Sequence, residues 1–117
     1  MSIEKRVRDA LLPIVPIVEP LRYDGDALTY ITFSYDELGE VYAEGQAQEL
    51  RYLLSIRLHL PLRPTASGES VNPRTYKRQI KAALVAAGCT TPNITDASDD
   101  GGQIYVFDCE AVDDGTS

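Results

Sequence analysis

The sequence predicts an α+β fold: an antiparallel sheet with a long central strand, one short N-terminal helix and one longer helix packed on the sheet. The first observation behind this prediction is the alternation between residues 50 and 60, where every even position is apolar and only one odd position is. A period of two is typical of a strand with one buried and one exposed face. The second observation is that a helical pattern precedes this strand and another follows it, which favours helices over its buried face.

The N-terminal pattern predicts a helix over residues 2–12, with Ser2 as its N-cap. Its apolar residues recur at helical spacing, namely Ile3, Val7, Ala10 and Leu11. Pro13 ends the helix because the residue before a proline is disfavoured in the helical conformation. Residues 13–20 then form a Pro-rich connector that is apolar enough to pack along a sheet edge.

Strands are expected within residues 29–60, in two parts. The first strand covers 29–35, and the long central strand covers 50–60. Between them, residues 36–49 carry five acidic residues, two glycines and no Lys or Arg, so we expect a loop there. A short strand from Glu40 to Glu44 is a possible element inside this loop.

The second helix is expected over residues 72–88. Asn72 suits the N-cap, Pro73 suits the first helical position, and Gly88 supplies the left-handed stop. Its apolar stripe consists of Tyr76, Ile80, Ala83, Leu84 and Ala87. Residues 93–112 are typical of a β-hairpin and residues 113–117 of a frayed tail, so residues 1–117 make one domain.

The composition argues against several classes of protein. The formal net charge of −7 disfavours a nucleic-acid binder, because phosphate contacts need clustered Lys and Arg. Two cysteines, Cys89 and Cys109, do not make a disulfide framework, and no apolar run suggests a secretory signal or a membrane span. We therefore expect a cytosolic protein with free thiols and no membrane partner.

No catalytic residue and no cofactor site is expected. His59, the only histidine, lies on the predicted exposed face beside Arg57 and Ser55, which suits a solvated sheet face better than a proton relay. Cys109 is expected in the core, and Cys89 follows a helix end whose dipole would raise its pKa.

No metal site is expected either. Residues 96–101 match the first half of a calcium loop, with Asp, Ser and Asp at alternate positions and then Gly. Such a loop requires a bidentate Glu at its last position, where this chain has Phe107. The acidic residues of this segment are better explained as a solvated turn.

Several local features of the chain, and the order in which they occur, point to a known family. A short N-terminal helix leads into the Pro-rich connector, and an acidic segment precedes a long Tyr/Leu-alternating strand that ends at Pro61. Further features are Tyr23-Asp24-Gly25, the strand from Tyr30 to Tyr35, the helix end Ala87-Gly88-Cys89 and, as the most specific part, the stretch from Asp96 to Glu110. Over residues 3–112 the chain resembles the small tail-completion proteins (tail-terminator and head–tail joining proteins) of long-tailed bacteriophages and prophages.

The resemblance implies an α+β subunit that assembles with copies of itself into a ring, typically a hexamer, at the head-proximal end of the tail. There it would stop growth of the tail tube and contact the tail tube protein and the head connector proteins. DNA would pass through the lumen without specific binding, which suits an acidic wall because repulsion acts over about 8–10 Å. The protein would be assembled in the bacterial host cytoplasm and end in the tail or neck of the virion.

The acidic segment 36–49 is the candidate functional surface. We expect it to line the lumen or to join adjacent subunits through its carboxylates, which are those of Asp36, Glu37, Glu40, Glu44 and Glu49. The alternative interpretation is a solvated loop without a function of its own.

Two other functions remain open. The first is another neck connector or a minor tail protein, which keeps the phage setting. The second, from a different class, is an acidic DNA mimic that inhibits a nucleic-acid enzyme. Arg51, Arg57 and the basic residues within 74–81 disfavour a mimic, because they interrupt any continuous acidic face. An enzyme is the least favoured class, since no base or metal site is evident.

Overall fold

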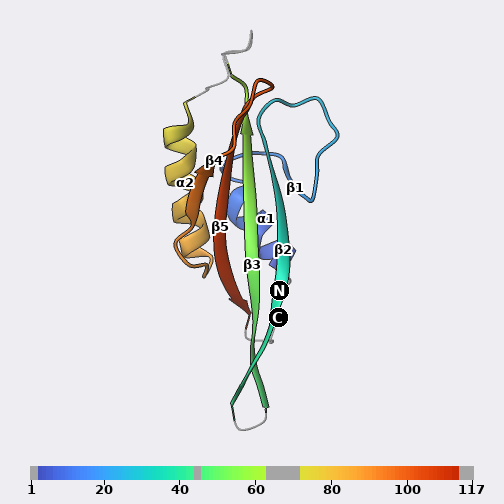
Figure 1. Cartoon of the computed structure of the whole chain (residues 1–117), viewed down its shortest axis with the longest axis vertical. Helices are drawn as coiled ribbons and strands as arrows, with labels where there is room; N and C mark the ends of the chain where they lie inside the picture. Colours follow the sequence, from blue (N-terminus) through green and yellow to red (C-terminus); the bar gives the residue numbers. More distant parts are fainter. Residues whose placement is uncertain (1–2, 44–45, 63–71, 114–117) are drawn as a thin grey trace.

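The computed structural model describes residues 3–43, 46–62 and 72–113, and for 38–43, 46–50 and 112–113 it describes the backbone alone. In chain order the elements are α1 (Ile3–Leu11), β1 (Val18–Pro20), β2 (Tyr30–Ala43), β3 (Gln46–Leu60), α2 (Pro73–Ala86), β4 (Asn93–Asp96) and β5 (Gln103–Asp113). They form a five-stranded sheet with two helices (Figure 1). The core-facing side chains of the sheet make one hydrophobic cluster with both helices. The predicted α+β class is confirmed.

The strands lie in the order β1-β2-β3-β5-β4, and β3 is the central one. It pairs antiparallel with β2 from Ala43↔Gln46 to Tyr30↔His59, and antiparallel with β5 over its last eleven residues. The prediction of a long central strand is therefore confirmed. The sheet is not wholly antiparallel, because the end of the Pro-rich connector forms β1, which pairs parallel with β2. This short edge position tolerates Pro20, which has no N–H to donate to a neighbouring strand.

The alternation along β3 is the alternation that the sequence predicts. Leu54, Ile56, Leu58 and Leu60 are buried, whereas Arg51, Leu53 and Arg57 are exposed. The neighbouring strands present their buried residues on the same rungs, since Phe33 of β2 and Phe107 of β5 both pair with Ile56. Three strands thus contribute one continuous apolar face, which the helices cover.

Both helices bury the predicted stripes. In α1, Ile3, Val7 and Leu11 are buried at intervals of four residues. In α2, Ile80 and Leu84 are buried. The Tyr35 hydroxyl of β2 also donates a 2.9 Å hydrogen bond to the Glu4 carboxylate of α1, which ties that helix to the sheet. Hydrogen bonding to an anionic acceptor raises the pKa of Tyr35, because ionisation of the phenol would break the bond.

The ends of α2 are set by the residues that predict them. The Asn72 side chain accepts a 3.0 Å hydrogen bond from the backbone N–H of Arg74, and Pro73 occupies the first helical turn. Gly88 has a φ of +95°, a left-handed conformation that glycine adopts without the steric cost of a Cβ. The predicted helix is confirmed, within two residues at its C-terminal end.

The prediction of a loop over residues 36–49 is wrong for the residues that the structure describes. β2 continues to Ala43 and β3 begins at Gln46, so both sides of this segment are paired strand. Pairing with the strongly alternating β3 outweighs the acidic, glycine-containing composition, because strand formation depends on cross-strand partners more than on intrinsic preference. Gly39 lies at a register shift, where an irregular backbone suits a glycine.

The C-terminal hairpin is confirmed, with β4 paired to β5 and a bridge between Asp99 and Gly102 at the turn. The Asp96 and Asp99 carboxylates accept hydrogen bonds from the backbone N–H groups of Ser98, at 2.9 Å, and of Gly101, at 2.8 Å. Their role in the structure is therefore to satisfy donors of the turn.

In the described part of the chain, no helix is long and apolar enough to cross a membrane.

Candidate functional site

The most distinctive part of the molecule is a two-stranded extension of the sheet. The last pair between β3 and β5 is Leu50↔Asp113, and beyond it, among the residues that the structure describes, β2 and β3 pair only with each other. We call this extension the hairpin arm and define it as residues 40–43 and 46–49, where Glu40 pairs with Leu50 on the last rung shared with β5. In Figure 1 it projects past the ends of both helices, and its strands cross each other in a marked twist. Four residues per strand correspond to a reach of about 13 Å.

Two register shifts accompany the arm. One lies between Glu37 and Gly39 at its root, and the other lies between Val41 and Tyr42 within it. Such β-bulges bend a strand and increase its right-handed twist. They therefore account for the twist of the arm that Figure 1 shows.

The structure distributes the predicted acidic residues along this ribbon. Asp36 and Glu37 are exposed at the root of the arm, and as consecutive strand residues they face opposite sides of the sheet. Glu40 pairs with Leu50 and Val41 pairs with Glu49, so the arm places Glu40 and Glu49 on adjacent rungs of opposite strands. Glu44 lies outside the described residues. Their rungs are adjacent, but Glu49 shares the face of Val41 and Glu40 lies on the opposite face, so the fold gathers the predicted residues on one segment and not at one point.

The hairpin arm has little apolar packing to stabilise it within its own chain. A two-stranded ribbon that packs on nothing is at best marginally stable in water, because it buries little apolar surface. No helix covers the arm in Figure 1, and no third strand pairs with it among the described residues. A long ribbon of this kind is stabilised most readily by contact with another molecule, and its outer backbone groups are open to pairing.

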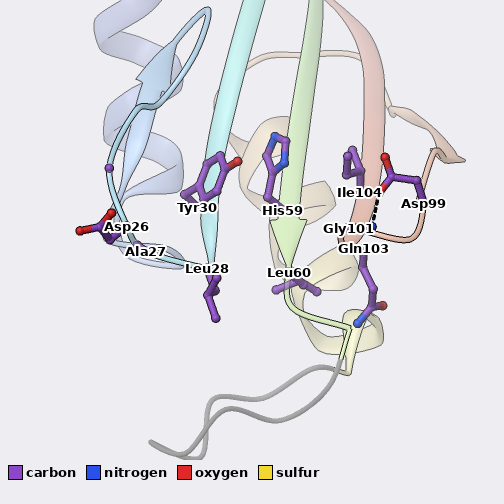
Figure 2. A pocket seen from close by; sticks show the side chains of 12 residues that line it. Asp26, Ala27, Leu28, Tyr30, His59, Leu60, Asp99, Gly101, Gln103 and Ile104 are labelled. Atoms are coloured by element: carbon purple, nitrogen blue, oxygen red, sulfur yellow. Dashed lines mark hydrogen bonds between the residues drawn. The ribbon is translucent and has the colours of Figure 1, made fainter.

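At the opposite end of the sheet lies a pocket of about 410 Å³ on the face that the helices leave open. Figure 2 shows Tyr30, His59 and Ile104 side by side on β2, β3 and β5, with Asp26 and Asp99 on opposite sides of this row. The His59 ring stacks on Tyr30, with a centroid distance of 4.2 Å and an interplanar angle of 11°.

The predicted solvated position of His59 is thus wrong in part, because its ring is half-buried. The Tyr30 ring that stacks on it covers one of its faces, and Tyr23, from the segment between β1 and β2, packs in turn on Tyr30 with a centroid distance of 4.7 Å. Burial, followed by the positive charge of Arg57, lowers the pKa of His59. Sequence reasoning missed this stack because the pairing of Tyr30 with His59 follows from the register between two strands.

His59 and Thr32 form the arrangement nearest to a catalytic pair among the described residues. The distance from Thr32 Oγ1 to His59 Nε2 is 3.3 Å, which is within reach of a nucleophile–base interaction. Thr32 is only 5% exposed, however, so its hydroxyl is closed to a substrate. The pair is best explained as a hydrogen bond that satisfies a buried hydroxyl.

The two cysteines lie close together in the core. Both are free and buried, and Cys89 forms an isolated bridge with Ala111, two residues from Cys109 on β5. A hydrogen bond with Cys89, together with burial, raises the pKa of Cys109. The same bond lowers the pKa of Cys89, which is opposite to the rise expected from its place after a helix.

Among the described residues, no group of three or more His, Cys, Asp or Glu side chains could hold a metal ion.

Comparison with known proteins identifies the fold alone. No protein-family model and no curated protein matches the chain. A solved structure of a protein that is named only by a sequence identifier matches with a TM-score of 0.59 and 14% sequence identity, over 96% of this chain and 89% of that one. This similarity shows that the architecture recurs over nearly the whole chain, and it carries no information on function.

Proposed function

We propose that this protein is a structural virion protein, a ring subunit that caps the tail tube of a long-tailed phage or joins the tail to the head. The observation that carries the proposal is the hairpin arm, a ribbon without a core of its own that is suited to contact with another subunit. Support also comes from the resemblance of residues 3–112 to tail-completion proteins. A ring needs two different surfaces on each subunit, and the arm can supply one of them.

The acidic residues fit this role in a channel or at a subunit contact. Asp36 and Glu37 are exposed, so their charge is available to solvent, DNA or a neighbour. Carboxylates on a lumen wall would repel passing DNA within about 8–10 Å at physiological salt. The proposed partners are further copies of this chain, the tail tube protein and the head connector proteins, with DNA passing through unbound.

Deleting the gene from its phage or prophage tests the proposal. Negative-stain electron micrographs of the induced lysate should show filled heads separated from tails. Overlong tails would identify a tail terminator, whereas tails of normal length would identify a joining protein. Intact, infectious virions would refute the structural role and leave the acidic inhibitor as the next hypothesis to examine.

Complementation of the deletion strain tests the arm itself. Glu40→Gln combined with Glu49→Gln should lower the phage titre, because it removes the carboxylates that the arm places on adjacent rungs. Asp24→Asn combined with Asp26→Asn is a matched control, since it removes the same charge from exposed residues near the other end of β2. Equal titres for the two pairs would contradict a specific role for the arm carboxylates.

A further inference from the structure

Leu21 lies in a strained turn directly after β1. The Arg22 N–H donates a 2.8 Å hydrogen bond to the Pro20 carbonyl, which closes a three-residue turn around Leu21. The φ of Leu21 is +68°, and among the described residues it is the one positive φ outside glycine. This turn has the hydrogen bond and the φ of a γ-turn of the rare, strained kind. Since a glycine would adopt this φ without a steric cost, the leucine is unfavourable to the backbone here.

The side chain of Leu21 gains little from its own chain. It is 79% exposed, more than any other large apolar residue that the structure describes. A single exposed leucine is ordinary on a protein surface, so exposure alone does not indicate a contact. At Leu21, however, the strain of the turn and the exposure of the side chain are both unfavourable to the isolated subunit. Strained residues persist chiefly where a function requires them, which favours a contact of this leucine with another molecule.

A recess of matching chemistry lies on the outer surface of α2. This recess, which we call the α2 hollow, has a volume of about 460 Å³ and is lined by Arg78, Lys81, Ala82, Val85 and Ala86. Val85 is 47% exposed, although the helix buries another face in the core. An apolar side chain placed over Val85 would remove apolar surface from water on both partners, which is favourable.

The charges around Leu21 and around the α2 hollow are opposite in sign. Residues 19–26 carry three acidic residues and one basic residue. In contrast, α2 carries no acidic residue and four basic ones, which are Arg74, Lys77, Arg78 and Lys81. Opposite net charges on the two segments favour their encounter and disfavour the contact of either segment with a copy of itself.

Leu21 and the α2 hollow lie on different sides of the molecule. β1 is the first strand in the sheet order β1-β2-β3-β5-β4, and Leu21 follows it at that edge. Figure 1 shows α2 beside β4 and β5, near the other edge of the sheet. A contact between Leu21 and the hollow would therefore join two molecules.

We propose that Leu21 of one subunit inserts into the α2 hollow of a second copy of this chain. The leucine would cover Val85, and the acidic segment around it would lie near the basic side chains of α2. Because the two surfaces differ, every subunit offers one of each, and the contact is head-to-tail. Such a contact closes into a ring when the rotation between neighbours permits it. The inference rests on the proposed ring and names two surfaces that would form it.

The role of Leu21 is tested by measuring the Tm of the purified protein and the phage titre for the same variants. Leu21→Gly should leave the Tm unchanged or raise it, because glycine relieves the strained turn and little apolar burial is lost. In the complemented deletion strain it should lower the titre by at least about tenfold, as expected for the loss of an interface anchor. Leu21→Met keeps a large apolar side chain and should keep the titre.

Leu62→Gly is the matched control for this experiment. It removes another exposed leucine, with 48% exposure, and should leave the titre unchanged. A lower Tm for Leu21→Gly would show that the leucine stabilises its own subunit. An unchanged titre for Leu21→Gly would show that no contact in the virion depends on the leucine. Either result overturns the proposal.

Photo-cross-linking identifies the surface that Leu21 contacts. A photoreactive amino acid replaces Leu21 in the full-length protein, which is expressed in the deletion strain during phage assembly. After irradiation, we expect covalent dimers whose cross-linked peptides contain residues 73–86 of the second copy. Ala82→Phe, which fills the hollow from an exposed position, should lower the dimer yield by about tenfold. Thr75→Phe, at an exposed position of α2 outside the hollow, is the matched control and should leave the yield unchanged.

The outcomes separate this inference from the proposed function. If deletion of the gene releases tails but the probe reaches no part of α2, the ring role stands and this contact is refuted. If the probe reaches α2 in a strain whose deletion still yields intact virions, the contact stands and the phage role is refuted. Cross-linking of position 21 only to a different protein would also overturn the contact proposed here.

Discussion

Replacing two leucines of the central strand, Leu58 and Leu53, by alanine tests the alternation on which the fold rests. Leu58 is fully buried on the face that the helices cover, whereas Leu53 is 42% exposed on the other face. Both residues lie within β3, and both pair with β2 and β5. The two substitutions therefore remove the same atoms from the same strand and differ only in the face that loses them.

The expected costs differ severalfold. Leu→Ala at a fully buried site costs about 2–5 kcal/mol, because it removes apolar burial and leaves a cavity that relaxes only in part. At Leu53 we expect a loss below about 1 kcal/mol, since much of the side chain already meets water. With an unfolding entropy of about 2.1 cal/mol/K per residue, a loss of about 3 kcal/mol at Leu58 lowers the Tm by about 12 °C.

The assay is urea unfolding followed by far-ultraviolet circular dichroism. Measurements at several protein concentrations would exclude a contribution from self-association, which would make the midpoint depend on concentration. The expected result is a large decrease in the midpoint for Leu58→Ala and a small one for Leu53→Ala, with similar slopes. Equal costs at the two positions, or a larger cost at Leu53, would refute the assignment of the two faces.

Three further predictions concern single sites. Burial lowers the pKa of His59, so below the ordinary value of 6.5 the folded state binds fewer protons than the unfolded state. The free energy of unfolding should therefore fall as the pH drops through this region. His59→Phe should make this pH dependence shallower in urea titrations between about pH 7.5 and 5.5. Gly88→Ala should cost about 1 kcal/mol of unfolding free energy because its φ of +95° is unfavourable for alanine; Gly88→Asn should cost less, and equal midpoints for the two variants would count against a backbone cause. The buried thiols of Cys89 and Cys109 should react slowly with a thiol reagent in the native protein and rapidly in urea, and fast native labelling would contradict their burial.

Local patterns in the sequence predict the helices well, because the signals for a helix lie within the helix and beside it. Asn72, Pro73 and Gly88 mark the limits of α2, and the structure uses each of them as expected. The buried stripe of α1 likewise follows from spacing alone. For the same reason, the turn at residues 98–102 is foreseen from its Asp and Gly residues.

The candidate site was only partly predictable. The acidic residues are evident from composition, but their place on a projecting ribbon depends on how far β2 and β3 extend beyond β5. The stack of Tyr30 on His59 depends equally on register, since these residues are 29 positions apart and pair only when the two strands are aligned. Neither fact is contained in a local window of the sequence.

By itself, the sequence determined the fold class, the helix limits and the buried face of the central strand, because periodicity and capping act over a few neighbouring residues. Only the tertiary structure decided that residues 36–43 and 46–49 are strand, that β1 joins the sheet in parallel, and that the hairpin arm extends past its neighbours. The physical reason is that strand pairing joins residues far apart in the chain. Cross-strand partners then outweigh the local preferences of acidic residues and glycine.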